Sequence, residues 1–425
     1  MVGHAADCSE PPRPGLAAAA LAHVAPARRA SLAPATRPRV SPRCRNRHQR
    51  PCRFHWCGQR PLPSILRGSE NRRGTTRGGA DPVTTTTRPE TRHDPHPFAP
   101  RERVALAAPR TRRPRPGCRR RRRSVAAAPW TLTGSLGTHD PNIYKTSTTW
   151  WIFETTDNNG IGVKFSSDGH AWTQGVPIFG SGLSWWQQYV AAGKPAQVWA
   201  PGCGEWGSMG YCYYAVSSFG SQKSAIGLTT SAGGIAAGKW VDQGAVVTSA
   251  PGDTFNAIDP ALAKTTSGSP YLVYGSFWNG IFIRPVSSTT LKPSGTPVNI
   301  ARDNVNGIEN GFVISHATNG TTWYYLFASK NACCKGADST YRIVVGRSSS
   351  ITGPYVDKAG VAMMSGGGTV LASSGSRFKG PGGQSLLADG SVIAWHAYDA
   401  QNNGAPVLFI NNVTWGSDGW PQPVW

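Results

Sequence analysis

The sequence predicts an all-β protein, a five-bladed β-propeller, preceded by a long N-terminal segment that lacks the composition of a folded core. Three observations support this prediction. An aromatic strand pattern occurs five times, a second alternating strand follows each occurrence, and the composition changes sharply near residue 128. We therefore expect a disordered segment over residues 1–128 and the propeller over residues 129–425.

The first repeated element is an aromatic or β-branched run that ends in small polar residues, as expected for a half-buried or buried strand. Successive copies begin 52 to 69 residues apart, and each is followed by a second run of alternating character. The first runs are Trp150–Thr156, Tyr211–Ser217, Tyr271–Phe277, Trp323–Ser329 and Val392–Asp399. The second runs are Ile161–Ser166, Ala225–Thr230, Ile281–Val286, Tyr341–Arg347 and Pro406–Asn411.

A short motif precedes each aromatic run and supplies a third element, and a divergent outer strand would complete four strands per unit. A period near 60 residues with this strand content is typical of radial repetition, in which each unit buries its faces against its neighbours. A β-sandwich is the alternative, but it does not require one motif order five times. The motifs begin at Asp140, Ala200, Asp259, Glu309 and Gly380.

The N-terminal segment is strongly basic, with 28 Arg and no Lys against 7 acidic residues, whereas the remaining chain has 16 basic and 15 acidic residues. It is rich in Arg, Pro and Ala and shows no sustained periodicity, so it cannot bury enough apolar surface to offset the entropy of ordering. The run Arg119–Arg123 suits phosphate binding, but no interleaved aromatic residues accompany it. We expect no nucleic-acid function, and a translated leader upstream of the true start is an alternative origin of this segment.

Cysteine usage and the absence of long apolar runs bear on location. No run approaches the 18 apolar residues of a membrane-spanning helix, so no membrane association is expected, and no convincing signal peptide is present. Cys203 and Cys212 flank a Gly-rich loop that suits a short disulfide in an oxidising compartment, with two free thiols as the alternative. Cys333 and Cys334 are too close for an ordinary bridge and lack partners at zinc spacing. We expect an extracellular protein.

Three of the five opening motifs carry a carboxylate, namely Asp140, Asp259 and Glu309. The inner strands of a propeller line one channel, so these residues are expected at equivalent positions around it. An Asp-Pro pair that merely caps a turn is the alternative for any one of them. Carboxylates that share a partly desolvated site acquire different pKa values, and such a pair is what glycoside hydrolysis requires.

Aromatic residues and one histidine are expected near the same channel. Phe219 and Trp278 lie beside the repeated strands, and their rings can pack on sugar C–H surfaces or belong to the core. His396 lies in the last aromatic run, where alternation places it opposite Trp395. A buried structural histidine and a ligand remain equal alternatives for it.

The chain resembles the endo-1,5-α-L-arabinanases of glycoside hydrolase family 43 from about Thr138 to Trp425. The resemblance rests on HDPNIYK, QVWAP, SSFGSQKSAIGL, NAIDPALAK, YGSFWNGI, GIENGFVI, ACCKGADSTYRIVVGRSSSITGPYVD, GPGG and WHAYD, which occur in this order. It implies a five-bladed propeller and an inverting hydrolase that acts on arabinan or arabino-oligosaccharides.

The resemblance also implies roles for individual residues. Asp140 matches the general base, Glu309 the general acid, and Asp259 the third carboxylate, which tunes and orients the acid. His396 matches a ligand of a calcium ion held largely through water molecules. The remaining matches line the arabinose-binding cleft and are Asn256, Phe219, Ser276 and Trp278.

Two positions depart from the family pattern. Gly202 stands where an acidic residue is usual after Trp-Ala-Pro, and Asn310-Gly311 follow the predicted acid where small residues such as Ala-Pro are common. These departures affect the surroundings of the site but remove no carboxylate. An exo-acting arabinofuranosidase or xylosidase of the same fold, or a non-catalytic carbohydrate-binding propeller, remains the alternative, and we expect a monomer.

Overall fold

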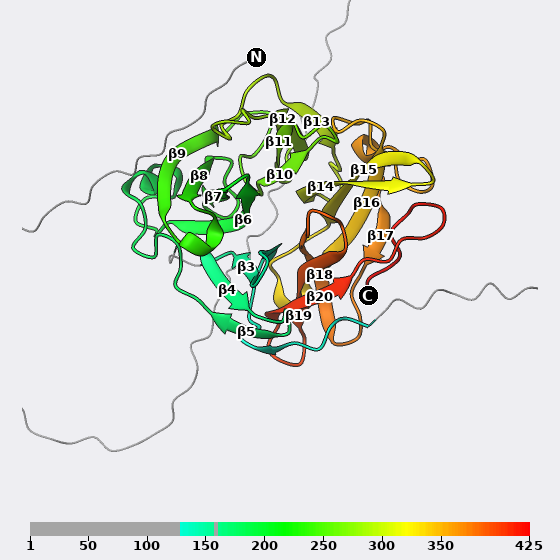
Figure 1. Ribbon diagram of the computed structural model, residues 1–425, viewed down its shortest axis with the longest axis horizontal. Helices are drawn as coiled ribbons and strands as arrows, with labels where there is room; N and C mark the ends of the chain where they lie inside the picture. The colour runs from blue at the N-terminus through cyan, green and yellow to red at the C-terminus, as the bar shows by residue number, and fades with distance from the viewer. Residues whose placement is uncertain (1–127, 157–159) are drawn as a thin grey trace, which may run out of the picture. The chain divides into compact units, whose positions relative to one another are not determined.

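The computed structural model describes residues 128–156 and 160–425. The predicted disordered segment, residues 1–128, lies outside the described residues except for Ala128. The described chain forms five largely antiparallel sheets arranged around a common centre, as Figure 1 shows. The predicted five-bladed propeller is therefore confirmed, and the β-sandwich is excluded.

Each blade is built from strands that follow one another in sequence, with the earliest innermost (Figure 1). Blade 1 contains β2 (Asn142–Lys145), β3 (Trp150–Glu154), β4 (Gly162–Ser166) and β5 (Ala171–Gln174). Blade 2 contains β6 (Gln197–Trp206), β7 (Met209–Ser217), β8 (Ser224–Ala232) and β9 (Trp240–Ser249). Blade 3 contains β10 (Ala261–Lys264), β11 (Pro270–Tyr274), β12 (Ile281–Pro285) and β13 (Val298–Ala301).

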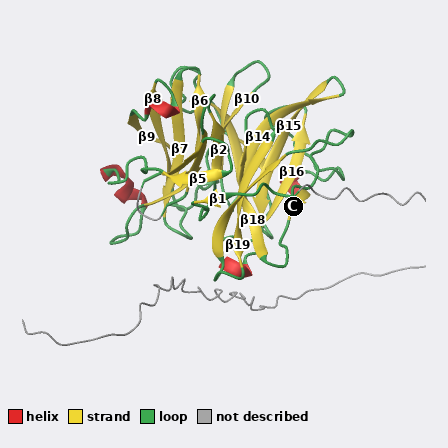
Figure 2. Ribbon diagram, turned by 60° about the horizontal axis from the view of Figure 1, so that its bottom comes forward, coloured by secondary structure: helices red, strands yellow, loops and turns green. Residues whose placement is uncertain are grey.

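Blade 4 contains β14 (Ile308–Thr318), β15 (Thr321–Lys330), β16 (Arg342–Ser348) and β17 (Thr369–Ala372). Blade 5 has only β18 (Phe378–Leu386), β19 (Val392–Asp399) and β20 (Ala405–Asn412). Short 3-10 helices lie in the connections at Ser184–Tyr189, Ile235–Ala237, Gly336–Asp338 and Met363–Ser365. The strands dominate the side view in Figure 2, and among the described residues no helix is long and apolar enough to cross a membrane.

The prediction of four strands in every unit is wrong for blade 5, because the start of the domain covers the outer edge of that sheet instead. The amide of Trp130 donates to the carbonyl of Ile410, the amide of Leu408 donates to the carbonyl of Leu136, and Gly137 forms a bridge with Val407. The same segment contributes β1 (Thr133–Gly134), which pairs with β5 of blade 1. Residues 130–137 therefore join blade 5 to blade 1 and close the ring.

Five separate hydrophobic clusters fill the spaces between neighbouring blades. Alternation along the strands explains this arrangement. In β15, Tyr324 and Leu326 pack toward blade 3, whereas Tyr325 and Phe327 pack toward blade 5. Every blade buries both faces, which is why the sequence repeats aromatic and β-branched runs rather than one apolar face per strand.

Candidate active site

The opening motifs converge at the centre of the ring, where the chain adopts an unusual backbone conformation. Asp140, Ala200, Asp259 and Asn310 have φ values of 48°, 39°, 56° and 51°, and Gly383 in blade 5 has 60°. In blade 5 the bend thus lies three residues after Gly380, where the predicted motif begins. Non-glycine residues at positive φ carry strain of about 1 to 3 kcal/mol and gather at functional sites. The repeated bend therefore marks one common position in all five blades.

This bend corrects one prediction from the sequence. Asn310, not Glu309, is the counterpart of Asp140 and Asp259, since the register of β14 shifts between Glu309 and Phe312 just as that of β6 shifts between Trp199 and Gly202. Glu309 thus lies one residue earlier in the repeat than expected. Nothing in the sequence marks the β-bulge, so the sequence does not show whether Glu309 or Asn310 is the counterpart of Asp140.

Asp140 lies among hydrogen-bonding partners that favour its charged form. Its Oδ2 is 2.7 Å from His139 Nδ1 and accepts a hydrogen bond of 2.7 Å from the Thr155 hydroxyl. Burial raises the pKa of Asp140, but the electrostatic effect and hydrogen bond of His139, the electrostatic effect of His396 and the Thr155 hydroxyl outweigh it and lower the pKa. Asp140 is consequently ionised at neutral pH.

Glu309 has the opposite character although it belongs to the same site. It is 7% exposed, its Oε1 accepts a hydrogen bond of 2.7 Å from the Tyr341 hydroxyl, and its Oε2 accepts one from Ser276. Burial raises the pKa of Glu309, the two hydroxyls lower it, and the negative charge of Asp140 raises it, so that the net direction is upward. A raised pKa favours the protonated form that a general acid needs.

Asp259, the third predicted carboxylate, lies close to the backbone that follows Glu309. Its Oδ2 accepts a hydrogen bond of 3.1 Å from the backbone amide of Asn310, the residue after Glu309. Burial and the charges of Glu309 and Asp140 raise the pKa of Asp259. The structure therefore brings all three predicted carboxylates into one electrostatic group.

Asn310 also fastens blade 4 to blade 5. Its side-chain amide donates to the carbonyl of Gln384, and the Gln384 amide donates back to the carbonyl of Asn310. The other departure from the family pattern has a steric basis, because a Cβ on Gly202 would lie 2.2 Å from the carbonyl oxygen of Pro260. No side chain fits at this position without backbone movement.

The predicted cleft residues divide into two kinds of environment. Phe219 and Trp278 are 64% and 41% exposed and line a hollow of about 730 Å³ together with Tyr189 and Lys223, so their rings are open to contact with a ligand. Asn256 is buried, and its Oδ1 accepts a hydrogen bond of 2.6 Å from Ser224. Ser276 is buried and donates a hydrogen bond to Glu309, so it orients the carboxyl group of that residue.

His396 lies beside Asp140 as expected and is fully buried. Its ring stacks on that of His139 with centroids 3.9 Å apart, and with Asp140 the two histidines form a group whose ligand atoms all lie within 4.8 Å of one another. The Nδ1 atom of His396 accepts the backbone N–H of Asp140 at 3.0 Å, so the neutral ring carries its proton on Nε2, which faces the Tyr398 hydroxyl.

This arrangement does not fit direct calcium binding by His396. Neither ring nitrogen offers a free lone pair, and calcium prefers oxygen ligands, of which the three-residue group supplies only the Asp140 carboxylate. The calcium ion stays a prediction.

Three residues of the site were not found from the sequence: His139, Thr155 and Tyr341. Asn310 was noted only as a departure from the family pattern. His139 directly precedes the predicted base, which is a usable signal. Tyr341 and Thr155 lie in strand patterns that also fit core packing, and only the folded arrangement brings their hydroxyls to the carboxylates.

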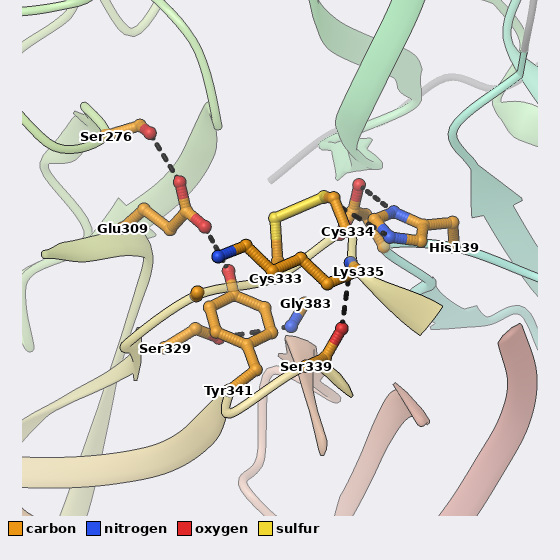
Figure 3. The surroundings of a disulfide bond; sticks show 12 residues. His139, Ser276, Glu309, Ser329, Cys333, Cys334, Lys335, Ser339, Tyr341 and Gly383 are labelled. Atoms are coloured by element: carbon orange, nitrogen blue, oxygen red, sulfur yellow. Dashed lines mark hydrogen bonds and ion pairs between the residues drawn. A yellow bond between two sulfur atoms is a disulfide. The ribbon is translucent and has the colours of Figure 1, made fainter. Parts of the chain in front are cut away.

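Both cysteine pairs form disulfides. The short Cys203–Cys212 bridge agrees with the disulfide alternative. Cys333 and Cys334, which are too close in sequence for an ordinary bridge, are bonded to each other as adjacent residues. Figure 3 shows this bond among side chains of the site.

A propeller whose centre holds an ionised carboxylate beside a buried carboxyl group of raised pKa has the makeup of a glycoside hydrolase. Comparison with known proteins agrees: residues 133–421 match glycosyl hydrolases family 43. The chain belongs to this family and is a glycoside hydrolase.

Two relatives are similar to this chain in sequence. An extracellular endo-α-(1→5)-L-arabinanase of Bacillus subtilis is 44% identical over 299 residues, which cover 70% of this chain and 90% of the relative. An extracellular exo-α-(1→5)-L-arabinofuranosidase of Cellvibrio japonicus is 35% identical over 303 residues, covering 67% of this chain and 85% of the relative.

Solved structures give the same picture. An endo-arabinanase of Bacillus licheniformis superimposes with a TM-score of 0.65 and 45% identity, covering 69% of this chain and 99% of that one. An α-L-arabinanase of Cellvibrio cellulosa, solved with arabinohexaose, gives a TM-score of 0.62 and 34% identity, covering 67% and 95%.

Proposed function

We propose that the protein is an endo-arabinanase that hydrolyses α-1,5-L-arabinofuranosyl linkages in arabinan with inversion of configuration. The observation that carries the proposal is the opposite displacement of two carboxyl pKa values within one site, downward for Asp140 and upward for Glu309. The names of the endo-arabinanases from Bacillus subtilis and Bacillus licheniformis support the choice of substrate.

In the proposed reaction, Asp140 accepts a proton from a water molecule while the water oxygen bonds to the anomeric carbon. Glu309 donates its proton to the glycosidic oxygen as the bond between that oxygen and the anomeric carbon breaks. Inverting enzymes hold the two carboxyl groups roughly 6.5 to 9.5 Å apart to admit the water. His139 and Thr155 keep Asp140 ionised, and Ser276 and Tyr341 orient Glu309.

Asp259 acts indirectly in this proposal. Its carboxyl group holds the Asn310 amide and thereby fixes the backbone next to Glu309. The charge that it carries when ionised also opposes ionisation of its neighbours in the buried group.

The test uses linear, debranched arabinan and the full chain. Early release of a series of oligosaccharides supports endo action, and proton NMR of the first product formed shows whether the new reducing end has the inverted anomeric configuration. Retained configuration contradicts the assignment of Asp140 as a base that activates water.

An exo-acting enzyme is the second candidate, because the relative from Cellvibrio japonicus is named an exo-arabinofuranosidase. The two candidates differ in their early products. Release of one short product of constant size from the onset of the reaction supports the exo candidate.

Secretion and a monomeric state complete the proposal. The two disulfides suit an oxidising compartment, and the relatives from Bacillus subtilis and Cellvibrio japonicus are named extracellular. Arabinanase activity in the culture medium of the source cells and light scattering of the purified protein test these two points. Metal analysis by mass spectrometry tests the calcium prediction.

A further inference from the structure

Three blades carry comparable connections between their second and third strands, and we call these the rim loops. They are residues 218–223 in blade 2, 275–280 in blade 3 and 331–341 in blade 4. The rim loops of blades 2 and 3 present large exposed rings, with Phe219 64%, Phe277 39% and Trp278 41% exposed. Phe219 and Trp278 line the same hollow, so this position in the repeat supplies apolar contact surfaces.

The rim loop of blade 4 presents a different apolar group at this position. Its aromatic residue, Tyr341, is buried and bonds to Glu309. The group that takes the place of a ring is the Cys333–Cys334 disulfide, whose two residues are both partly exposed. Sulfur is polarisable and a weak hydrogen-bonding partner, so a disulfide offers apolar surface in a compact form.

Contacts place this disulfide beside the catalytic group. The Cys334 Sγ atom is 3.9 Å from His139 Nε2, and the Cys334 amide donates to the Tyr398 hydroxyl. That hydroxyl is 2.7 Å from His139 Nε2, and His139 Nδ1 is 2.7 Å from Asp140. The other end of the loop is Tyr341, whose hydroxyl donates a hydrogen bond to Glu309. Figure 3 draws the bond together with Glu309, Tyr341 and His139.

The loop has other interactions that hold its shape. The Thr340 amide donates to the carbonyl of Ala332 at 3.0 Å, and the Lys335 amide donates to the Ser339 hydroxyl at 3.0 Å. Cys203–Cys212 differs in being 5% and 0% exposed inside the cluster between blades 1 and 2. One disulfide therefore belongs to the core, and the other is partly exposed at the site.

We infer that the Cys333–Cys334 disulfide is a substrate-contacting surface, on which the C–H face of an arabinofuranosyl unit packs next to the carboxylates. In blade 4 the disulfide supplies the apolar contact surface that the exposed rings supply in blades 2 and 3. The inference rests on the proposed arabinan substrate and adds a specificity-determining contact to the same site.

The test compares the full-length enzyme with Cys333→Ala/Cys334→Ala, and uses Cys203→Ala/Cys212→Ala as the matched control that also lacks one disulfide. Loss of the apolar contact is expected to raise KM for linear arabinan about fivefold and to change the cleavage positions in end-labelled arabinohexaose, with little change in Tm. The control is expected to lower Tm and to keep the KM and cleavage pattern of the wild type.

Chemical reduction provides a second measurement that does not depend on folding of the variants. A water-soluble phosphine, applied to the native enzyme, should reduce the partly exposed Cys333–Cys334 bond before the buried one. Alkylation and mass spectrometry identify the freed thiols. The same rise in KM at full labelling of Cys333 and Cys334 supports the inference.

Two results would overturn it, and they are distinguishable. A wild-type enzyme that cleaves arabinan, with unchanged KM and cleavage pattern after loss or reduction of the bond, overturns the inference alone. A folded wild-type enzyme that releases nothing from arabinan overturns the proposed function together with this inference.

Discussion

Two carboxyl groups on opposite sides of the active site have pKa values shifted in opposite directions. On the blade 1 side, Asp140 is paired with His139 and Thr155 and its pKa is lowered. On the blade 4 side, Glu309 accepts hydrogen bonds from the neutral hydroxyls of Ser276 and Tyr341, and burial together with the charge of Asp140 raises its pKa. The comparison indicates that the neighbours of a carboxyl group, rather than its identity, set its protonation state, and this difference underlies the proposed roles of base and acid.

The largest effect is expected from removing the two carboxyl groups separately. Asp140→Asn and Glu309→Gln should each lower kcat on arabinan by about a thousandfold, since general acid or base catalysis contributes about 10²- to 10⁴-fold. An arabino-oligosaccharide with a 4-nitrophenyl leaving group separates the two roles, because nitrophenolate leaves without a proton. Glu309→Gln should recover most of its activity on that substrate and Asp140→Asn should not.

Circular dichroism of both variants serves as the folding control for this experiment. Recovery by Asp140→Asn instead of Glu309→Gln would reverse the assignment of base and acid.

The pH profile of kcat/KM should respond differently to changes on the two sides. Activity rises with pH as Asp140 loses its proton and falls as Glu309 loses its own. His139 and Thr155 lower the pKa of Asp140, so Thr155→Val should move the acidic limb to higher pH. Ser276 and Tyr341 lower the pKa of Glu309, so Tyr341→Phe should move the alkaline limb to higher pH.

Each variant is the control for the other, because each should leave the opposite limb in place. A Tyr341→Phe enzyme whose alkaline limb moves downward would show that this hydroxyl does not stabilise the ionised acid.

A smaller effect is expected at Asn310, which carries the positive φ of the blade 4 bend. Asn310→Gly and Asn310→Ala both remove the side-chain hydrogen bond to Gln384, which contributes about 1 kcal/mol. Asn310→Ala additionally places an alanine in the left-handed region, which costs about 1 kcal/mol more. Denaturant titration should therefore rank the free energies of unfolding as wild type, then Asn310→Gly, then Asn310→Ala.

An equal free energy of unfolding for the two variants would indicate that the bend relaxes without cost. The measurement thus tests whether the backbone conformation shared by the blades is maintained under strain.

The fold could be predicted from the sequence because the same burial requirement recurs in each blade. Runs such as Tyr211–Ser217 and Trp323–Ser329 must face two neighbours at once, so they carry apolar residues on both faces, and the same demand recurs in five units. Blade 5 departed from the prediction because its outer edge is completed by residues 130–137, which are distant in sequence and carry no strand pattern.

The site was accessible only in part. Asp140, Asp259 and Glu309 stand out because three of the five opening motifs carry a carboxylate in a globular part with only 15 acidic residues. The one-residue offset of Glu309 depends on a bulge, and the hydroxyls of Thr155 and Tyr341 reach the carboxylates only through tertiary packing. The bond between Cys333 and Cys334 was missed because adjacent cysteines were judged by the geometry of ordinary bridges.

The closure of the ring through residues 130–137 has a consequence for how the chain tolerates cutting. The segment links the first and last blades by backbone hydrogen bonds to β20 and by its pairing with β5, so it works as a clasp. A protease that cleaves before Trp130 leaves the clasp intact. A cut between Leu136 and Asp140 breaks the covalent link between the clasp and the first strand of blade 1. Asp140 lies three residues after the end of the clasp. The segment that closes the ring therefore also fixes the position of the proposed catalytic base.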